Sequence, residues 1–323
     1  MPEETNNLKK YRVAVIVQSV IIAALLLTVA GMLILLLQKP EAEPAVLIED
    51  ATEPTVEENS TESEGFYRMN GKKIYFNDPV YGDIYLPVYA DVPACAYAQE
   101  NVIRRNGMTY YLEDGGITSF FGIDVSAHQK DIDWETVKAA GVDFAMIRLG
   151  YRGYGSGELV PDENFDKNVQ GALDAGIDVG VYFFSQAITE KEAVEEANMT
   201  IAMLGDYEIT YPVVYDWEVI TGDKARTDNI AVEMLTKCAV AFCDTIEEAG
   251  FTPMVYQNKR TSLFKLALPD IAQYDFWLAE YGDEATFYYN YDMWQYTDEG
   301  RIPGIEGDVD LNICFTDYAN KEN

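Results

Sequence analysis

The sequence predicts an α/β barrel related to the (β/α)8 class and irregular in its last third, preceded by an apolar segment, an acidic linker and a small β-rich module. Two observations predict the barrel: helical stretches that end at glycine and lead into apolar strands, and a run of eight strand-like segments downstream of residue 120. A third observation, the sharp changes of composition before residue 120, separates the barrel from what precedes it. We therefore expect one large domain over residues 120–323.

The first segment predicts a membrane anchor. Residues 1–12 are polar and basic, and Val13–Leu37 is almost entirely apolar and long enough to cross a bilayer as a helix. Because the positive charges precede the apolar segment, we expect residues 1–12 in the cytoplasm and the rest of the chain outside the membrane. Cleavage near Ala30, as in a signal peptide, is the alternative, although such peptides have shorter apolar regions.

The next two segments predict a spacer and a β-rich module. Residues 38–65 repeat Glu among Pro, Thr and Ser, which is typical of an extended, disordered linker. Residues 66–119 are rich in aromatic side chains and contain Asn-Gly pairs at 70–71 and 106–107, an offset of 36 residues (106 minus 70). We expect two related hairpins in one small module. Its tyrosines either stack on sugars or pack the hairpins, and both interpretations stay open.

The barrel region alternates strands with helices. Three junctions place alanine and glycine, the usual left-handed end of a helix, before an apolar strand: Ala140-Gly141, Ala175-Gly176 and Ala249-Gly250. The predicted strands are 121–125, 144–149, 179–184, 212–216, 252–256, 276–279, 293–296 and 309–312. The longest predicted helix, over residues 229–248, has an apolar stripe of Ile230, Met234, Leu235, Cys238, Phe242 and Ile246.

The composition excludes several classes of function. The formal net charge is -32, from 23 Lys and Arg against 55 Asp and Glu, so no basic surface is available to neutralise nucleic-acid phosphates. The single histidine, His128, excludes a multi-histidine zinc site and a Ser-His-Asp triad built on any other histidine. The four cysteines are scattered, and we expect buried thiols and no metal ligands.

Two acids, Asp216 and Glu218, are separated by one residue at the end of a predicted strand. Because side chains two apart on a strand point to the same face, the carboxylates lie together while Trp217 faces the opposite side. In barrels of this class the chemistry lies at the carboxyl ends of the strands, where we also place Asp124 and Asp310. Paired carboxylates on rigid elements suit glycosidic bond cleavage, one as proton donor and one stabilising positive charge on the sugar.

Seven short blocks of the barrel region form an ordered set. They are Ile123-Asp124-Val125-Ser126-Ala127-His128-Gln129 with Ile132-Asp133-Trp134, Ile147-Arg148-Leu149-Gly150-Tyr151, Tyr182-Phe183-Phe184-Ser185-Gln186-Ala187, Tyr215-Asp216-Trp217-Glu218, Trp277-Leu278-Ala279-Glu280-Tyr281, Trp294-Gln295-Tyr296 and Val309-Asp310-Leu311-Asn312. This set resembles the glycoside hydrolase family 25 enzymes, the lysozyme-type muramidases. The resemblance covers about residues 121–317 and does not touch the first 120.

The resemblance implies hydrolysis of the β-1,4 bond between N-acetylmuramic acid and N-acetylglucosamine in peptidoglycan, without a metal or organic cofactor, in a flattened (β/α)5(β)3 barrel. The family's general acid falls on Glu218 and its partner carboxylate on Asp216. The aspartate of the first strand falls on Asp124, with a turn-capping role as the alternative, and the late aspartate falls on Asp310, with Asp308 as a weaker candidate.

A sugar groove is expected around these carboxylates. Asp216 is expected to stay ionised, and its charge is expected to raise the pKa of Glu218, so that Glu218 keeps a proton near neutral pH. Three roles stay open for the ionised Asp216: it stabilises an oxocarbenium-like state, orients the N-acetyl group of the substrate or activates water. The expected groove residues are Gln129, Arg148, Tyr182, Gln186, Trp277, Tyr281, Trp294 and Gln295, with packing inside the barrel as the alternative for each. His128 is expected to be a structural hydrogen-bond partner, and Glu280, which departs from the family pattern, is expected to alter the groove without removing the chemistry.

Anchor and barrel together predict a single-pass protein of the bacterial cell membrane with an extracellular peptidoglycan hydrolase. One alternative is a non-catalytic wall-binding or scaffold protein that uses the groove, and another is an enzyme that acts on a different acetylated glycan. The stereochemical outcome stays open, because two side chains on one strand face, with Cα atoms roughly 6.5 Å apart, span both the retaining and the inverting carboxylate separations.

Overall fold

The computed structural model describes residues 67–320, which belong to one compact unit. The predicted segments 1–12 and 13–37, the whole predicted linker 38–65 and residue 66 of the predicted β-rich module lie outside the described residues. Within residues 67–320, no helix combines the length and apolar character needed to cross a membrane.

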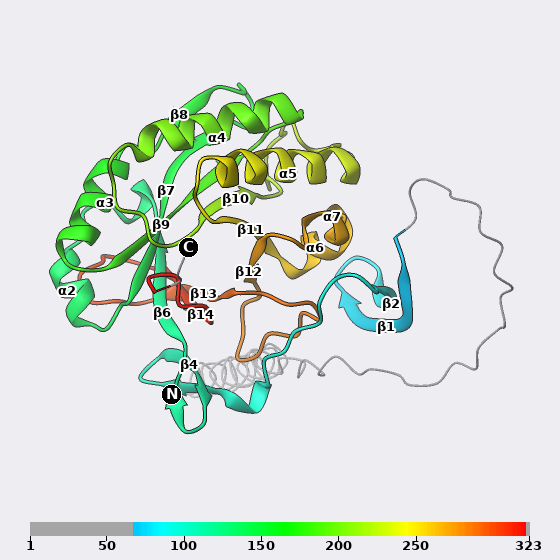
Figure 1. Cartoon of the computed structure of the whole chain (residues 1–323), viewed down its shortest axis with the longest axis horizontal. Coiled ribbons are helices and arrows are strands. Elements are labelled where there is room, and N and C mark those ends of the chain that lie inside the picture. Colours follow the sequence, from blue (N-terminus) through cyan, green and yellow to red (C-terminus); the bar gives the residue numbers. More distant parts are fainter. Residues whose placement is uncertain (1–66, 321–323) are drawn as a thin grey trace, which may run out of the picture. The chain divides into compact units, whose positions relative to one another are not determined.

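Eight strands close into a barrel (Figure 1). They are β6 (Phe120–Val125), β7 (Phe144–Arg152), β9 (Asp178–Ser185), β10 (Val213–Trp217), β11 (Pro253–Asn258), β12 (Asp275–Ala279), β13 (Met293–Gly300) and β14 (Val309–Cys314). Neighbouring strands from β6 to β13 run parallel, whereas β14 is antiparallel to both β13 and β6 and closes the ring. A short strand, β8 (Leu159–Pro161), extends the sheet beside the end of β7. All eight predicted strands are confirmed.

Helices follow the first five barrel strands and are absent between β12, β13 and β14 of this described region, which is the (β/α)5(β)3 order. They are α2 (Trp134–Ala139), α3 (Phe165–Asp174), α4 (Glu190–Leu204), α5 (Val232–Glu248), α6 (Lys259–Lys265) and α7 (Leu268–Ile271). The glycines predicted to end three helices adopt left-handed backbone, with φ of 95° at Gly141, 73° at Gly176 and 89° at Gly250.

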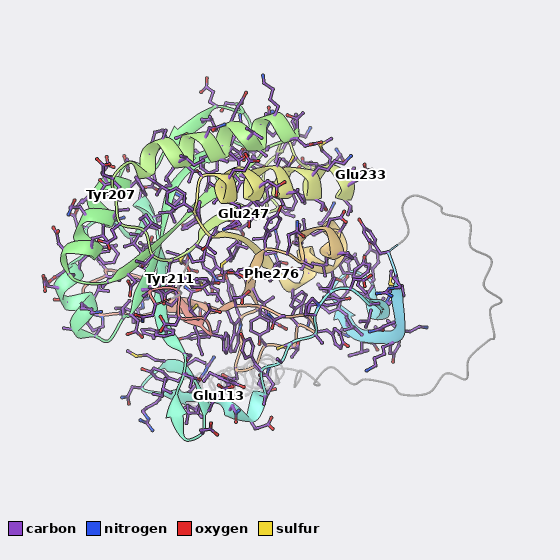
Figure 2. The ribbon with its side chains drawn as sticks, in the orientation of Figure 1. Glu113, Tyr207, Tyr211, Glu233, Glu247 and Phe276 are labelled. Carbon is purple, nitrogen blue, oxygen red and sulfur yellow. The ribbon has the colours of Figure 1, made fainter. Side chains whose placement is uncertain are left out.

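Helix α5 shows how the helices attach to the barrel. Its apolar stripe packs inward, with Leu235, Cys238 and Phe242 fully buried, and the burial of Leu235 and of Phe242 contributes about 1.5–3 kcal/mol each. Glu233 and Glu247 on the same helix lie on its exposed side (Figure 2). The amphipathic pattern therefore decides which face of the helix meets the strands.

Two apolar cores lie on the two sides of the barrel wall. Tyr215 and Trp217 of β10 belong to the outer core beneath the helices, whereas Val214 belongs to the inner core. The inner core fills the barrel below its upper rim, where the rings of Phe144 and Tyr211 stack at 4.5 Å. The alternation along β10 is the reason that Asp216 points into the barrel while Trp217 faces the opposite side.

Residues 67–119 form a two-stranded hairpin and a separate three-stranded antiparallel sheet. Strands β1 (Met69–Asp78) and β2 (Gly82–Tyr89) pair with each other, and β4 (Met108–Glu113) pairs with β3 (Val102–Arg105) and β5 (Gly116–Ile117). A single three-residue 3-10 turn, η1 (Gln99–Asn101), precedes β3. The second Asn-Gly prediction is confirmed, because Asn106 and Gly107 turn the chain between β3 and β4 with positive φ at both residues.

The first Asn-Gly prediction is wrong. Asn70-Gly71 lies inside β1, where the register shifts between Met69 and Lys73, and the chain reverses instead after Asp78. The carboxylate of Asp78 accepts hydrogen bonds from the backbone N–H groups of Val80 and Tyr81, so an aspartate-based turn takes the place expected for Asn-Gly.

The tyrosines of this region divide into two groups. Tyr97 stacks on Phe315 at 3.9 Å, and Tyr111 is buried against the same ring, so both pack the hairpin region onto the barrel. Tyr81 and Tyr85 are exposed. Packing therefore accounts for the first group.

Candidate active site

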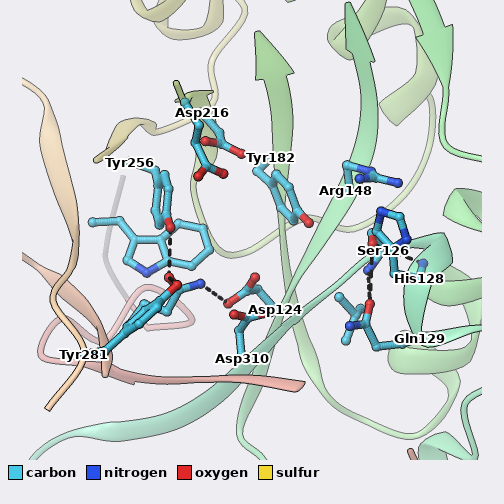
Figure 3. Close-up of a pocket in the computed structure, with 14 residues that line it drawn as sticks. Asp124, Ser126, His128, Gln129, Arg148, Tyr182, Asp216, Tyr256, Tyr281 and Asp310 are labelled. Carbon is cyan, nitrogen blue, oxygen red and sulfur yellow. Dashed lines mark hydrogen bonds between the residues drawn. The ribbon is translucent and has the colours of Figure 1, made fainter. Parts of the chain in front are cut away.

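A cavity of about 190 Å³ opens at the barrel rim where the parallel strands end (Figure 3). Its lining residues are Asp124, Val125, Ser126, His128, Gln129, Arg148, Tyr182, Asp216, Glu218, Tyr256, Trp277, Tyr281, Gln295 and Asp310. Ten of the twelve residues predicted for the site are among them. Within residues 67–320, no group of three or more His, Cys, Asp or Glu side chains is arranged to hold a metal ion.

The four predicted carboxylates meet in this cavity from three strands. Asp124 lies near the end of β6, Asp216 near the end of β10 and Glu218 just beyond it. Asp310 lies at the beginning of β14, not at a carboxyl end as predicted. It still reaches the same rim because β14 runs antiparallel and pairs Asp310 directly with Asp124.

Asp308 does not share this site. It is half exposed and forms an ion pair with Arg301 at 2.8 Å, outside the cavity. Residues two apart on a strand share a face, but Asp308 precedes the first residue of β14. The side chain of Asp308 therefore does not follow that of Asp310 to the cavity wall. Of the two candidates, Asp310 is the one that faces the site.

Asp124 is held by two side-chain amides. Its Oδ2 accepts hydrogen bonds from Nε2 of Gln295 at 2.9 Å and from Nδ2 of Asn312 at 2.8 Å. The indole N–H of Trp277 donates to the oxygen of Asn312 at 2.9 Å, which turns the amide donor toward Asp124. Burial raises the pKa of Asp124 to about 6, and the two amide donors, which favour the ionised form, limit the increase.

Asp216 has a contrasting environment. It is 4% exposed, and within the described chain its Oδ1 has no hydrogen-bond partner. Burial first, and then the charges of Glu218 and Asp124, raise the pKa of Asp216 well above the ordinary carboxyl value, while Arg148 acts in the opposite direction. The surroundings of Asp216 therefore favour its protonated form.

Glu218 lies nearer the mouth of the cavity and is partly exposed. Burial and then Asp310 raise the pKa of Glu218 above its ordinary value, and burial and then Asp124 raise the pKa of Asp310 to about 8. The increase is larger for Asp216 than for Glu218, the reverse of the predicted order, because Asp216 is the more buried of the two and lacks a donor at Oδ1.

Aromatic side chains form the wall beside the carboxylates. The ring of Trp277 contacts Tyr256 edge-on at 4.8 Å between centroids and Tyr182 at 6.3 Å. Tyr281 is 53% exposed at the mouth, and its hydroxyl donates to Gln295 at 3.1 Å. Flat rings beside hydrogen-bonding groups suit the alternating apolar and hydroxyl faces of a sugar.

The opposite wall is more polar. Arg148 donates to the buried carboxylate of Asp162 at 2.8 Å, so its guanidinium is held beside the cavity. The side-chain oxygen of Gln129 accepts the backbone N–H of Ser126 at 2.9 Å, and the hydroxyl of Ser126 accepts the backbone N–H of His128. This reciprocal cap fixes the turn after β6, and the imidazole of His128 is exposed at its edge.

Two predicted groove residues lie outside the cavity. Trp294 is fully buried in the outer core, and its indole N–H donates to the carbonyl of Glu280. Gln186 is also fully buried behind β10, where it hydrogen-bonds protein groups. Trp294 precedes Gln295 on β13, and successive strand residues point to opposite faces of the sheet.

Gln186 instead supports the strand end that carries Glu218. Its Nε2 donates to the backbone carbonyl of Glu218 at 3.1 Å, and Thr227 donates its hydroxyl to the Gln186 oxygen at 2.6 Å. On the other side of β10, Gln257 donates to the backbone carbonyl of Trp217. The side-chain amides of Gln186 and Gln257 thus hydrogen-bond the backbone from both sides at the end of β10, and they position the backbone of Glu218.

Glu280 also has a role that differs from the prediction. It lies outside the cavity and accepts hydrogen bonds from Lys259 at 3.0 Å and from the backbone N–H of Thr286 at 2.8 Å and Phe287 at 3.1 Å. It therefore orders the connection from β12 to β13. Tyr256 is a cavity residue that the sequence reasoning missed, although its place at the end of a predicted strand, like that of Asp216, was the available signal.

The barrel region is similar in sequence to known proteins. The model of the glycosyl hydrolases family 25 matches residues 123–305, more than half of the chain, and the match ends before Asp310. The autolytic lysozyme of Clostridium acetobutylicum is 25% identical over 193 residues, 59% of this chain and 54% of the relative. Lysozyme M1 of Streptomyces globisporus is 28% identical over 203 residues, 59% of this chain and 66% of the relative. The chain thus spans about half the length of the first relative and about two thirds of the second.

Solved structures show the same barrel. The modular autolysin LytC of Streptococcus pneumoniae, solved in complex with a synthetic peptidoglycan ligand, superposes with a TM-score of 0.54 and 26% identity over 76% of this chain and 57% of LytC. A bacterial lysozyme of Streptomyces coelicolor superposes with a TM-score of 0.52 and 25% identity over 60% of this chain and 90% of that enzyme. Family model, relatives and fold agree, and the chain belongs to glycosyl hydrolase family 25.

Proposed function

We propose that this protein is a membrane-anchored, extracellular peptidoglycan hydrolase that cleaves the β-1,4 bond between N-acetylmuramic acid and N-acetylglucosamine. The observation that carries the proposal is the meeting of Asp124, Asp216, Glu218 and Asp310 in one cavity walled by aromatic rings and amides. The relatives named as lysozymes, and the LytC complex with a peptidoglycan ligand, support this substrate. No metal or organic cofactor is part of the proposal.

Glu218 is the general acid of the proposed reaction. It lies at the mouth of the cavity, where a glycosidic oxygen can reach it, and burial and Asp310 raise its pKa so that it keeps a proton to donate. Protonation of the leaving oxygen allows the C–O bond to break as positive charge develops on the sugar.

Asp216 and Asp124 have separate roles in the proposed reaction. Asp216, whose pKa is raised well above the ordinary range, orients the substrate with its carboxyl group, because a protonated carboxyl can donate as well as accept a hydrogen bond. Asp124 carries the negative charge, because two amides donate to it and its pKa is only about 6. That charge stabilises the oxocarbenium-like transition state.

The anchor rests on the sequence. The apolar segment Val13–Leu37 follows basic residues and precedes the acidic linker, which supports a single span with the barrel outside a bacterial cell. A barrel tethered in this way acts on the wall of its own cell. Protease treatment of intact cells after wall removal should degrade the barrel and leave a membrane-bound N-terminal fragment, whereas a barrel protected from protease contradicts the proposed orientation.

The hydrolysis is tested on purified peptidoglycan with the full chain in detergent. Mass spectrometry should find new reducing ends on N-acetylmuramic acid, and Glu218→Gln should lower the rate by at least about 100-fold, because general acid catalysis contributes about 10²–10⁴-fold. Glu299→Gln, an exposed site outside the cavity, is the matched control. Peptidoglycan that is retained but not cut indicates a wall-binding protein, and cleavage of chitin oligomers in preference to peptidoglycan indicates a different glycan.

A further inference from the structure

The connection between β12 and β13, residues 280–292, carries Tyr281 to the cavity. Apart from one bridging residue it has no helix or strand of its own. Its conformation matters to the site, because the hydroxyl of Tyr281 donates to Gln295, and Gln295 donates to Asp124. Glu280 orders part of this connection through Thr286 and Phe287, and contacts from elsewhere in the chain hold the rest of it.

Residues 89–111, here called the brace, run alongside this connection. In Figure 1 the cyan segment between β2 and β3 lies beside the orange connection from β12 to β13. The contacts join backbone or side-chain donors of one segment to acceptors of the other: Cys95 N–H to the Tyr288 carbonyl at 2.8 Å, Asn290 N–H to the Pro93 carbonyl at 2.9 Å, Gln99 Nε2 to the Ala285 carbonyl at 2.9 Å, and Tyr89 N–H to Tyr289 Oη at 3.1 Å. The brace thus provides partners for polar backbone groups that the connection does not satisfy itself.

Arg104 is the brace residue that contacts the backbone next to Tyr281. Its Nη2 donates to the carbonyl of Gly282 at 2.5 Å, its Nη1 pairs with Asp283 at 2.5 Å, and its guanidinium lies 5.6 Å from the ring centre of Tyr296. The ion pair alone is weak, because Asp283 is 85% exposed. The bond to the Gly282 carbonyl fixes the backbone immediately after Tyr281.

We infer that the brace is part of the active-site architecture and that Arg104 is a positioning residue, which acts by holding Tyr281 against Gln295. Residues 89–111 would then have a role in the reaction without touching the substrate. The inference rests on the proposed hydrolysis. It assigns a role to a region that lies outside the family match.

A double-mutant cycle in the full chain tests the inference. Arg104→Ala should lower kcat on peptidoglycan by about 5- to 10-fold with a smaller change in KM, since a displaced catalytic group can cost up to about 100-fold. In a Tyr281→Ala background the same change should have almost no further effect, and Arg104→Lys should recover part of the rate. Arg105→Ala is the matched control, because Arg105 is the exposed neighbour and forms no ion pair within residues 67–320.

Hydrogen exchange gives a readout that does not depend on activity. In Arg104→Ala, the amides of residues 282–288 should exchange faster than in the wild type, with unchanged exchange in β6 and β10, and Arg105→Ala should resemble the wild type. Equal behaviour of the two arginine variants, or fully additive losses in the cycle, overturns the inference. An inactive wild-type chain refutes the proposed hydrolysis instead, and exchange in the connection still decides whether Arg104 holds it.

Discussion

Gln295 donates its side-chain amide to Oδ2 of Asp124 across 2.9 Å, and the amide cannot turn around. Its oxygen accepts the hydroxyl protons of Tyr256 at 2.8 Å and Tyr281 at 3.1 Å, and a reversed amide would place that oxygen against the carboxylate oxygen of Asp124, which only accepts hydrogen bonds. The Asp124 carboxylate therefore has a fixed donor whose hydrogen bond favours the ionised form.

Replacing this donor should shift the pH dependence of the reaction. Asp124 must be ionised in the proposed mechanism, so kcat/KM should fall as pH decreases through about 6. Gln295→Met removes a bond that favours the charged form, which raises the pKa of Asp124 and moves the acidic limb to higher pH by about one unit. The exposed Gln170→Met serves as the control, and an unmoved limb in Gln295→Met contradicts the assigned charge on Asp124.

Asp216 should destabilise the fold at neutral and alkaline pH. Its pKa is raised on folding, so above about pH 4 the native state holds a proton that the unfolded chain has released, and stability falls as pH rises. Asp216→Asn removes this penalty. We expect unfolding free energies near those of the wild type at pH 4 and greater by about 1–3 kcal/mol at pH 8, together with loss of activity.

Thermal unfolding across pH measures this effect. Asp206→Asn, at an exposed position, should follow the wild type at every pH. If Asp216→Asn and wild type keep a constant difference between pH 4 and pH 8, then Asp216 does not hold a proton in the native state.

Replacement of Gln186 should lower kcat and leave KM unchanged. It supports the carbonyl of Glu218 from behind β10, and Thr227 orients its amide. Gln186→Leu should lower kcat by about 10-fold, because a small displacement of the general acid is costly, and Thr227→Val should have a smaller effect of the same kind. Steady-state kinetics on soluble glycan fragments separate the two constants. A rise in KM alone would indicate that Gln186 binds the substrate, as the sequence predicted, and does not position Glu218.

The two tryptophans of β12 and β13 should behave differently. Trp294 packs in the outer core and donates to the Glu280 carbonyl, so Trp294→Phe should lower the unfolding free energy by about 1–3 kcal/mol with little change in KM. Trp277 lines the cavity and orients Asn312, so Trp277→Phe should change kcat or KM. Urea unfolding and kinetics on both variants decide the matter, and equal kinetic effects would contradict the assigned faces.

The barrel was predictable because its signals are local. Apolar strands and glycine helix ends such as Gly141 can be read from neighbouring residues, and all eight strands were confirmed. The carboxylates at the rim were predictable for a related reason, since strand ends in this class gather on one edge.

The remaining features depend on partners distant in sequence. The period of β13 places Trp294 and Gln295 on opposite faces but does not say which face is inside the barrel. The position of Asp310 at the rim depends on the direction of β14, and that direction is set by the antiparallel pairing of β14 with β6. The relative protonation of Asp216 and Glu218 followed from burial and from the absence of a donor to Asp216 Oδ1 within the described chain, and neither is visible in an acid-x-acid pair.

The antiparallel closure by β14 has a consequence for biosynthesis. Asp310 and Asn312 enter the site only when β14 pairs with β6, a contact that spans 188 residues between Asn312 and Asp124. Until that last strand is made and docked, Asp124 lacks one of its two donors and the ring of strands is open. A nascent or prematurely terminated chain would therefore emerge without a complete site, and under the proposed function such incomplete copies would not cut the cell wall.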